Sequence, residues 1–346
     1  MRCLSELSRT LFLLVLIIAS IQHVEGQDRL KRTYPYKTIG KVRILADVYR
    51  KPDDIVRPAV LYIHGGALIM GNRSWLDPAQ AQKYLDAGYT IISIDYRLAP
   101  QAKLDQILED LHDAYRWARL DGPRLFRIDP NRIAVVGHSA GGYLALMAGS
   151  RLSPPPAAVV SFYGYGDIAG EWYSRPDPFY SRQPAVTKKE AYQSVGTRVI
   201  TEDPDAKRER FYLYTRQQGL WPQEVVGHDP EKEPEIFEPL CPIRHVTKSY
   251  PPTLLLHGDN DTDVPFEQSV LMARELEHRG VQHEFIAMPG KGHGFDQDLS
   301  DPTIAAAFDR VLSFLKKQLW RIETAASVRG ETQERSTDGP FDVRHE

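Results

Sequence analysis

The feature that most constrains this chain is the segment Gly137–Gly142, which reads Gly-His-Ser-Ala-Gly-Gly. The apolar, β-branched run Arg132–Val136 precedes it and predicts a buried strand, and residues 143–149 favour a helix. Ser139 therefore stands at the apex of a tight turn between a strand and a helix. The glycines remove side chains that would collide at such a turn. The helix N-terminus favours a negatively charged oxygen beside the serine, which is the setting of a nucleophilic serine.

The composition is that of an ordinary globular protein. Hydrophobic residues make up 42% and charged residues 26% of the 346 residues, and this length accommodates one large α/β domain or two smaller ones. The net charge of −3 gives no reason to expect a nucleic-acid partner. We also find no histidine, cysteine or carboxylate spacing typical of a metal site, so neither a metal nor an organic cofactor is expected.

The first 26 residues have the character of a signal peptide. Arg2 and Arg9 precede the uninterrupted apolar run Leu11–Ala19, which is too short to span a bilayer comfortably. Cleavage before Gln27 predicts an exported protein, secreted or periplasmic, with no stable membrane span afterwards. The alternative is a segment that stays uncleaved as an N-terminal anchor.

Strands and helices alternate along most of the remaining chain. Buried strands are predicted at 59–63, 89–94, 132–136, 157–163, 253–258 and 283–288, and helices at 78–86, 104–118, 140–149, 267–279 and 302–319. This alternation predicts a mostly parallel sheet with helices on both faces. Apolar residues recur at every second position between Thr38 and Tyr49, which predicts antiparallel strands before the parallel ones.

A serine nucleophile needs a base within hydrogen-bond reach and an acid that orients the base. His293 lies in a glycine-rich loop directly after the strand at 283–288, which makes it the candidate base. Three aspartates, Asp259, Asp261 and Asp263, follow the strand at 253–258, and turn chemistry explains two of them. The order serine, aspartate, histidine is the order found in α/β-hydrolases.

Acyl transfer also needs backbone N–H groups that stabilise the oxyanion. Ala140 follows the serine and supplies one N–H group. The turn His64-Gly65-Gly66-Ala67 follows the strand at 59–63, and its glycines let the backbone approach a substrate closely. We expect His64 to brace this turn rather than to act as a base.

Five motifs in this order resemble the α/β-hydrolase superfamily, and in particular its esterase and lipase branch related to hormone-sensitive lipase and bacterial carboxylesterases. They are His64-Gly65-Gly66, Asp95-Tyr96-Arg97-Leu98-Ala99-Pro100, Gly137-His138-Ser139-Ala140-Gly141-Gly142, His257-Gly258-Asp259-Asn260-Asp261 and Gly292-His293-Gly294-Phe295. The resemblance implies the α/β-hydrolase fold, a mostly parallel central sheet with helices on both faces and a cap insertion.

The resemblance also assigns roles to individual residues. It implies Ser139 as nucleophile, His293 as base and Asp261 as the acid in preference to its two neighbours, with oxyanion donors at Gly65, Gly66 and Ala140. The chain departs from the branch at Ala67, where a third glycine is usual, and at His138, where an aspartate often precedes the serine.

Residues 164–250 interrupt the regular alternation. They contain nine prolines and twelve aromatic residues, with helices expected only at 186–195 and 206–218. The resemblance places a lid here, so we expect a cap over the active site within a hydrolase domain of residues 27–320. Five aromatic residues of this segment are candidate substrate contacts, although packing within the cap explains each of them equally well: Trp172, Tyr173, Phe179, Tyr180 and Trp221. The polar tail at 321–346 is expected to be disordered.

The sequence therefore predicts a serine hydrolase that cleaves a small-molecule carboxylic ester through an acyl-serine intermediate. Two alternatives stay open, a serine peptidase of the same fold and a non-catalytic binding protein on a hydrolase scaffold. The peptidases usually carry a large accessory domain, for which this chain is too short, and the binding proteins often lose a triad residue, whereas this chain has all three. The sequence identifies neither the natural ester nor the oligomeric state.

Overall fold

The computed structural model describes residues 29–320, so the predictions for residues 1–26 and 321–346 lie outside the described residues. Eight strands form one sheet in the order β1-β2-β4-β3-β5-β6-β7-β8. The pairs β1–β2 and β2–β4 are antiparallel, and every later pair is parallel. The predicted fold, a mostly parallel sheet with an antiparallel start, is thereby confirmed.

The strands are β1 (Leu30–Ile39), β2 (Val42–Arg50), β3 (Arg57–Ile63), β4 (Thr90–Ile94), β5 (Ile128–His138), β6 (Ala158–Phe162), β7 (Thr253–Gly258) and β8 (His283–Met288). The helices of the sheet layers are α1 (Pro78–Asp86), α2 (Leu104–Leu120), α3 (Gly122–Phe126), α4 (Ala140–Arg151), α10 (Glu267–His278) and α11 (Pro302–Leu319).

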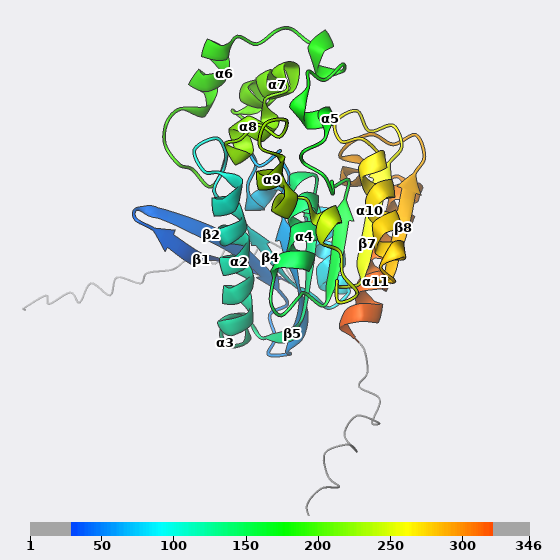
Figure 1. Ribbon diagram of the computed structural model, residues 1–346. Helices are drawn as coiled ribbons and strands as arrows, with labels where there is room; N and C mark the ends of the chain where they lie inside the picture. The colour runs from blue at the N-terminus through cyan, green and yellow to red at the C-terminus, as the bar shows by residue number, and fades with distance from the viewer. Residues whose placement is uncertain (1–28, 321–346) are drawn as a thin grey trace, which may run out of the picture.

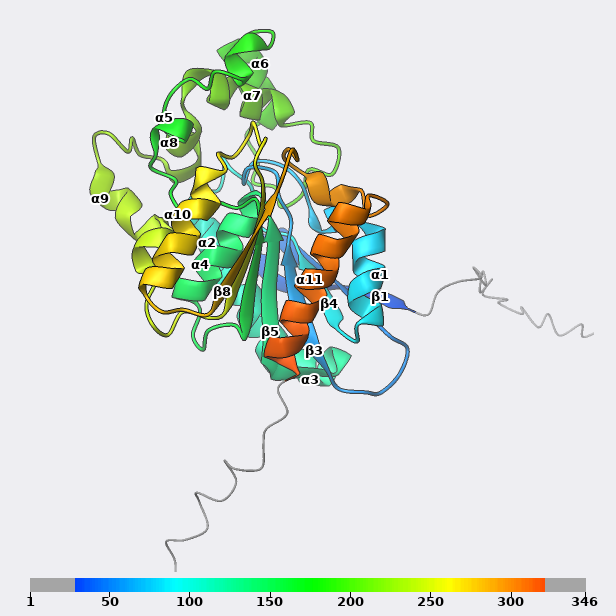
Figure 2. The ribbon, with the colours of Figure 1, turned by 90° about the vertical axis from the view of Figure 1, so that its right-hand side faces the viewer.

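Helices cover both faces of the sheet (Figure 1, Figure 2). Helices α1 and α11 pack on one face, where they meet alternate residues of the central strands such as Val60 and Val136. Helices α2, α4 and α10 pack on the other face, against the intervening residues such as Leu61 and Val135. The strands are buried on both faces, which explains why they read as continuous apolar runs.

Two helices begin where the sequence predicts because each starts with an Asp-Pro pair. The Asp77 side chain accepts hydrogen bonds from the N–H groups of Ala79 and Gln80 at the start of α1, and Asp301 caps α11 in the same way. The following proline fits the first helical turn because its missing N–H would have no partner there.

Strand β1 differs from the prediction, because it begins at Leu30 instead of near Thr38. Most of its side chains are exposed, and its apolar residues do not alternate regularly with polar ones. Pairing with β2 fixes the extended conformation of this strand, and hydrophobic periodicity cannot report such pairing.

The cap segment, residues 164–250, lies between β6 and β7 and rises over the carboxyl ends of the parallel strands (Figure 1). The two expected helices are present as α6 (Lys188–Val195) and α7 (Glu209–Gln218). Three shorter helices accompany them, α5 (Glu171–Ser174), α8 (Trp221–Val226) and α9 (Pro234–Phe237). Between residues 29 and 320, no helix is both long and apolar enough to cross a membrane.

Buried Arg208 joins the cap segment to the sheet domain. Its Nη1 donates to the carbonyl oxygens of Ala99 (2.7 Å) and Ile69 (3.3 Å). Its Nη2 donates to Oε1 of Gln101 (2.8 Å) and to the carbonyl oxygen of Val195 (3.1 Å). One guanidinium thus satisfies four acceptors from both parts of the chain, and this holds α7 in a fixed position above the sheet.

Candidate active site

Ser139 occupies the sharp turn between β5 and α4, with φ 55° and ψ −118°. A residue other than glycine rarely adopts a positive φ unless the surrounding structure imposes it. The flanking glycines show why the turn is so tight. A Cβ atom on Gly137 would lie 2.0 Å from the carbonyl oxygen of Gly141, and one on Gly141 would lie 2.1 Å from the carbonyl oxygen of Ile63. The backbone of β5, β3 and α4 therefore meets at contact distance around the serine.

The structure brings the three predicted triad residues together. His293 Nε2 lies 3.0 Å from Ser139 Oγ, and His293 Nδ1 lies 2.7 Å from Asp261 Oδ2. The loops after β7 and β8 carry the aspartate and the histidine, and the turn after β5 carries the serine. All three lie at the carboxyl edge of the sheet, where α/β proteins bind their ligands.

Asp261 is fixed by more than the histidine. Its Oδ1 accepts hydrogen bonds from the backbone N–H groups of Asp263 (2.8 Å) and Val264 (3.0 Å). Its Oδ2 also lies 3.3 Å from Nε2 of the buried His257. Burial acts to raise the pKa of this carboxyl, but hydrogen bonds from His257 and His293 outweigh it and hold the pKa well below the usual value. Asp261 is therefore ionised at neutral pH.

His293 has a second carboxylate beside it. Burial acts to lower the pKa of the imidazole, but the nearby charge of Asp263 and the hydrogen bond and charge of Asp261 together raise it above the ordinary histidine value. Oδ2 of Asp263 lies 3.5 Å from Nε2, the ring nitrogen that faces Ser139. A histidine in this setting is a strengthened base for the serine proton.

The predicted oxyanion loop follows β3 and is braced from below. The Tyr96 hydroxyl donates to the carbonyl oxygens of His64 (3.0 Å) and Gly65 (3.3 Å), and the Tyr96 ring stacks on the His64 ring. Burial lowers the pKa of His64 to about 3, so this histidine is neutral and braces the loop, as expected. Ala67 takes the place of the third glycine of the branch and adopts φ 56°.

Gly65 comes close to Ser139. A Cβ atom on Gly65 would lie 3.0 Å from the carbonyl oxygen of His138 and 3.2 Å from Ser139 Cβ. In the described part of the chain, no backbone carbonyl accepts a hydrogen bond from the N–H groups of Gly65, Gly66 or Ala140. Backbone N–H groups that lie close to the serine and donate to no backbone carbonyl can donate to an oxyanion, as in an oxyanion hole.

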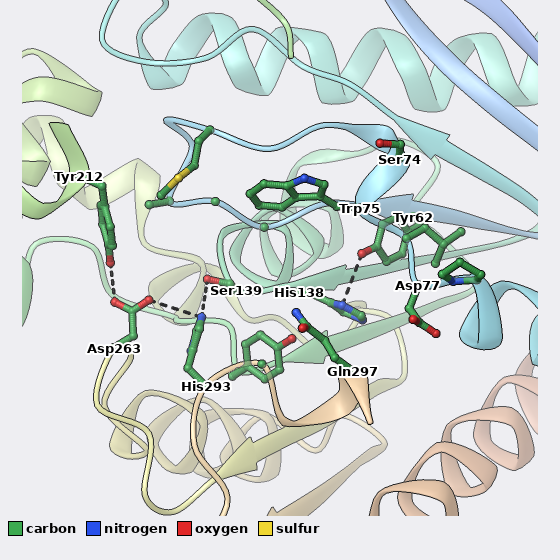
Figure 3. Close-up of a pocket in the computed structure, with 18 residues that line it drawn as sticks. Tyr62, Ser74, Trp75, Asp77, His138, Ser139, Tyr212, Asp263, His293 and Gln297 are labelled. Carbon is green, nitrogen blue, oxygen red and sulfur yellow. Dashed lines mark hydrogen bonds and ion pairs between the residues drawn. The ribbon is translucent and has the colours of Figure 1, made fainter. Parts of the chain in front are cut away.

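A cavity of about 660 Å³ opens above Ser139 (Figure 3). In Figure 3, Tyr212 and Asp263 lie on one side of the serine, and Tyr62, Asp77 and His138 lie on the other. The lining thus combines aromatic rings with carboxylates, and its size suits a small organic substrate. Among residues 29–320, no group of three or more His, Cys, Asp or Glu side chains is arranged to hold a metal ion.

The cap aromatics singled out in the sequence do not line this cavity. Trp221 and Tyr173 are buried and stack on each other, and Trp172 stacks on Tyr173. Phe179 is exposed, and Tyr180 packs against Tyr212. For the four rings other than Phe179, packing within the cap is the correct explanation, because they meet other rings instead of the space above the serine.

Tyr212 is the cap residue that reaches the cavity, and sequence reasoning missed it. It also missed Asp263, which lines the cavity although turn chemistry seemed to explain it. His138, beside the serine, is buried among Tyr62, Phe162 and Tyr163, and burial lowers its pKa. The only signal for Asp263 in the sequence was its position two residues after Asp261, the predicted acid.

Comparison with known proteins supports this assignment of the fold. A family model described as the alpha/beta hydrolase fold matches residues 60–297, a range that includes Gly65, Ser139, Asp261 and His293. Esterase LipC of Mycobacterium tuberculosis is 30% identical over 270 residues, which cover 73% of this chain and 57% of that protein. A non-reducing polyketide synthase of Stereocaulon alpinum is 29% identical over 315 residues, which cover 78% of this chain but 12% of the synthase. This chain thus spans only part of the length of these curated relatives.

Solved structures give the same result. An alpha/beta hydrolase superfamily protein from Enterococcus faecalis has a TM-score of 0.66 and 26% identity, covering 83% of this chain and 99% of that one. Carboxyl esterase 2 of the fungus Tuber melanosporum has a TM-score of 0.63 and 20% identity, covering 87% of this chain and 90% of that one, a likeness of fold. The match over residues 60–297 shows that the chain belongs to the α/β-hydrolase fold family.

Proposed function

We propose that this protein hydrolyses carboxylic esters through an acyl-serine intermediate. The observation that carries the proposal is the continuous chain of contacts from Asp261 through His293 to Ser139, with distances of 2.7 and 3.0 Å. A serine whose hydroxyl lies within reach of an oriented imidazole is the arrangement that acyl transfer requires.

In the first step, Ser139 Oγ attacks the ester carbonyl while His293 Nε2 takes its proton. Ionised Asp261 accepts the Nδ1–H hydrogen bond, which keeps the Nε2 lone pair directed at the serine and stabilises the imidazolium that forms. The N–H groups of Gly65, Gly66 and Ala140 stabilise the oxyanion, and losing one such donor typically slows the reaction by about 10²–10³-fold.

The same groups then complete the acylation and hydrolyse the acyl-serine. His293 gives its proton to the leaving alcohol, and the carbon–oxygen bond of the ester breaks. Water then enters, His293 takes a proton from it, and the hydroxide attacks the acyl-serine. The carboxylic acid leaves, and Ser139 regains its proton.

The test is hydrolysis of p-nitrophenyl acetate by the wild type and by Ser139→Ala. We expect turnover by the wild type, loss of turnover in the variant, and covalent labelling of the wild type alone by a fluorophosphonate probe. A wild type that neither turns over activated esters nor reacts with the probe would show a non-catalytic binding protein. Turnover of peptide amides in addition to esters would favour the peptidase alternative.

A further inference from the structure

Asp263 is placed differently from an ordinary turn residue. It lines the cavity above Ser139, and its side chain is 18% exposed. Its Oδ2 faces Nε2 of His293 at 3.5 Å, on the side where the serine proton is exchanged (Figure 3). The carboxylate is thus close enough to Ser139 and His293 to contact a bound substrate, although it is not one of the three proposed triad residues.

The other oxygen of this carboxylate is held firmly. Oδ1 accepts hydrogen bonds from the Tyr212 hydroxyl and from Nη1 of Arg216, the latter at 2.8 Å. Arg216 Nη1 also donates to the backbone carbonyl oxygen of Asp263 at 3.0 Å. Tyr212 and Arg216 thus occupy Oδ1, and Oδ2 is the carboxylate oxygen that faces His293 in the cavity lining.

Arg216 is itself rigidly fixed. Its side chain is 1% exposed, and its Nη2 donates to Asp177 Oδ2 at 2.6 Å. Four aromatic rings surround its guanidinium within 6 Å: Trp172, Tyr173, Tyr180 and Tyr212. The cap thus positions Asp263 through a buried cation, and a group fixed in this way is preorganised for binding.

We propose that Asp263 Oδ2 accepts a hydrogen bond from a hydroxyl group of the leaving alcohol, next to the ester oxygen, and so selects esters of polyhydroxylated alcohols such as glycols and sugars. This inference rests on the proposed esterase function and deepens it.

The geometry follows from the reaction. The leaving oxygen must come within hydrogen-bond distance of His293 Nε2, because it receives its proton there. A hydroxyl on the neighbouring carbon lies one hydrogen-bond length from that oxygen, and Oδ2 is 3.5 Å from the same nitrogen. The two oxygens of a vicinal diol monoester therefore fit the nitrogen and the carboxylate at the same time.

A neutral donor fits better than a cation. Arg216 pairs with Asp263 and also with Asp177, so it offsets part of the charge of Asp263 and reduces the attraction for an ammonium group. What remains is an oriented acceptor oxygen in the cavity lining. Such a site rejects an alcohol that lacks the donor, because the buried acceptor then stays unpaired.

The experiment compares kcat/KM for 2-hydroxyethyl acetate, 2-methoxyethyl acetate and acetylcholine. The first two esters differ in one donor hydrogen, and the third tests a cationic alcohol. We expect the wild type to prefer the hydroxyethyl ester over the methoxyethyl ester by about 10- to 100-fold, the worth of one hydrogen bond to a charged acceptor. Equal rates, or a preference for acetylcholine, would overturn the proposal.

Asp263→Asn provides the variant. Its amide oxygen would take the Oδ1 position facing Arg216 and Tyr212, so its NH₂ group would replace the acceptor Oδ2 with a donor. We expect the preference ratio to collapse toward one, whereas any change in His293 basicity alters both rates equally. Asp259→Asn is the matched control, because this exposed residue of the same loop bonds the N–H of Gly290, away from the cavity. An unchanged ratio in Asp263→Asn would refute the proposal.

The wild-type comparison needs no variant, so it still decides the question if Asp263→Asn does not fold. If the wild type hydrolyses none of the three esters or p-nitrophenyl acetate, the proposed function fails and this inference fails with it. If the wild type hydrolyses both neutral esters without preference, the esterase function stands and only the role of Asp263 is refuted.

Discussion

Asp261→Asn tests the triad more sharply than removal of the serine does. Oδ1 of Asp261 accepts two backbone hydrogen bonds, from Asp263 and Val264, at 2.8 and 3.0 Å. In the variant, these donors hold the amide oxygen at that position, so the NH₂ group faces His293 Nδ1. The imidazole then has to accept at Nδ1 and carry its proton on Nε2, facing Ser139. A histidine protonated on Nε2 cannot take the serine proton.

The magnitude follows from the cost of the opposite arrangement. Flipping the amide would leave two buried backbone donors unpaired, at about 1–3 kcal/mol each and thus about 2–6 kcal/mol together. This corresponds to a factor on the order of 30 to 20,000 in the population of the active tautomer. Loss of the carboxylate that stabilises the imidazolium adds to this, so we expect kcat to fall by about 10³–10⁴-fold.

The assay is hydrolysis of p-nitrophenyl acetate across pH, with circular dichroism to confirm folding. Because His293 acts when deprotonated, its raised pKa places the acid limb of kcat/KM above the ordinary histidine value, and the variant should move that limb to lower pH. Asp259→Asn, in the same loop but exposed, should behave as the wild type. Activity of Asp261→Asn within tenfold of the wild type, alongside an inactive Ser139→Ala, would refute the tautomer argument.

Three further predictions concern the fold and the export of the protein. Gly141→Ala would place a Cβ atom 2.1 Å from the carbonyl oxygen of Ile63, so it should lower the free energy of unfolding by about 3 kcal/mol or more, measured in urea. Gly292→Ala is the control, because the nearest atom to its Cβ would lie at 3.6 Å, and its free energy of unfolding should stay within about 1 kcal/mol of the wild type. Arg208→Lys cannot satisfy four acceptors and should lower the unfolding free energy by about 2–4 kcal/mol, measured in the same way. Exported protein should begin near Gln27 on N-terminal sequencing, and retention of residue 1 would contradict the signal-peptide proposal.

The sheet and its helices could be predicted closely because each depends on local pattern. Helix α11 occupies Pro302–Leu319, as predicted, because an aspartate cap and a proline fix its start and a regular apolar face fixes its length. The serine turn was equally predictable, since the required glycines, strand and helix are all neighbours in sequence. Patterns among residues close in sequence therefore sufficed to predict most of the fold and the serine turn at the centre of the site.

The cap segment resisted prediction because its structure depends on distant contacts. Nothing near Arg216 indicates that it pairs with Asp177 and Asp263, which are 39 and 47 residues away. Tyr212 lies one helical turn before Arg216, but the other three aromatic rings around it are more distant in sequence, and only the folded chain brings them to the guanidinium. Composition could show that the segment was unusual, but not which residue reached the cavity.

The three aspartates after β7 show where the limit of sequence reasoning lies. Asp259 is exposed and accepts a hydrogen bond from the N–H of Gly290, 31 residues along the chain, which local turn chemistry does not describe. Asp261 is buried and orients His293, and Asp263 directs one oxygen into the cavity while a cap arginine holds the other. The residue type is the same at all three positions, and the spacing is two. Their roles differ because burial and partners differ, and two of the partners of Asp263, Tyr212 and Arg216, come from the cap segment. We therefore propose that the cap segment affects selectivity by fixing the position of the Asp263 carboxylate beside His293.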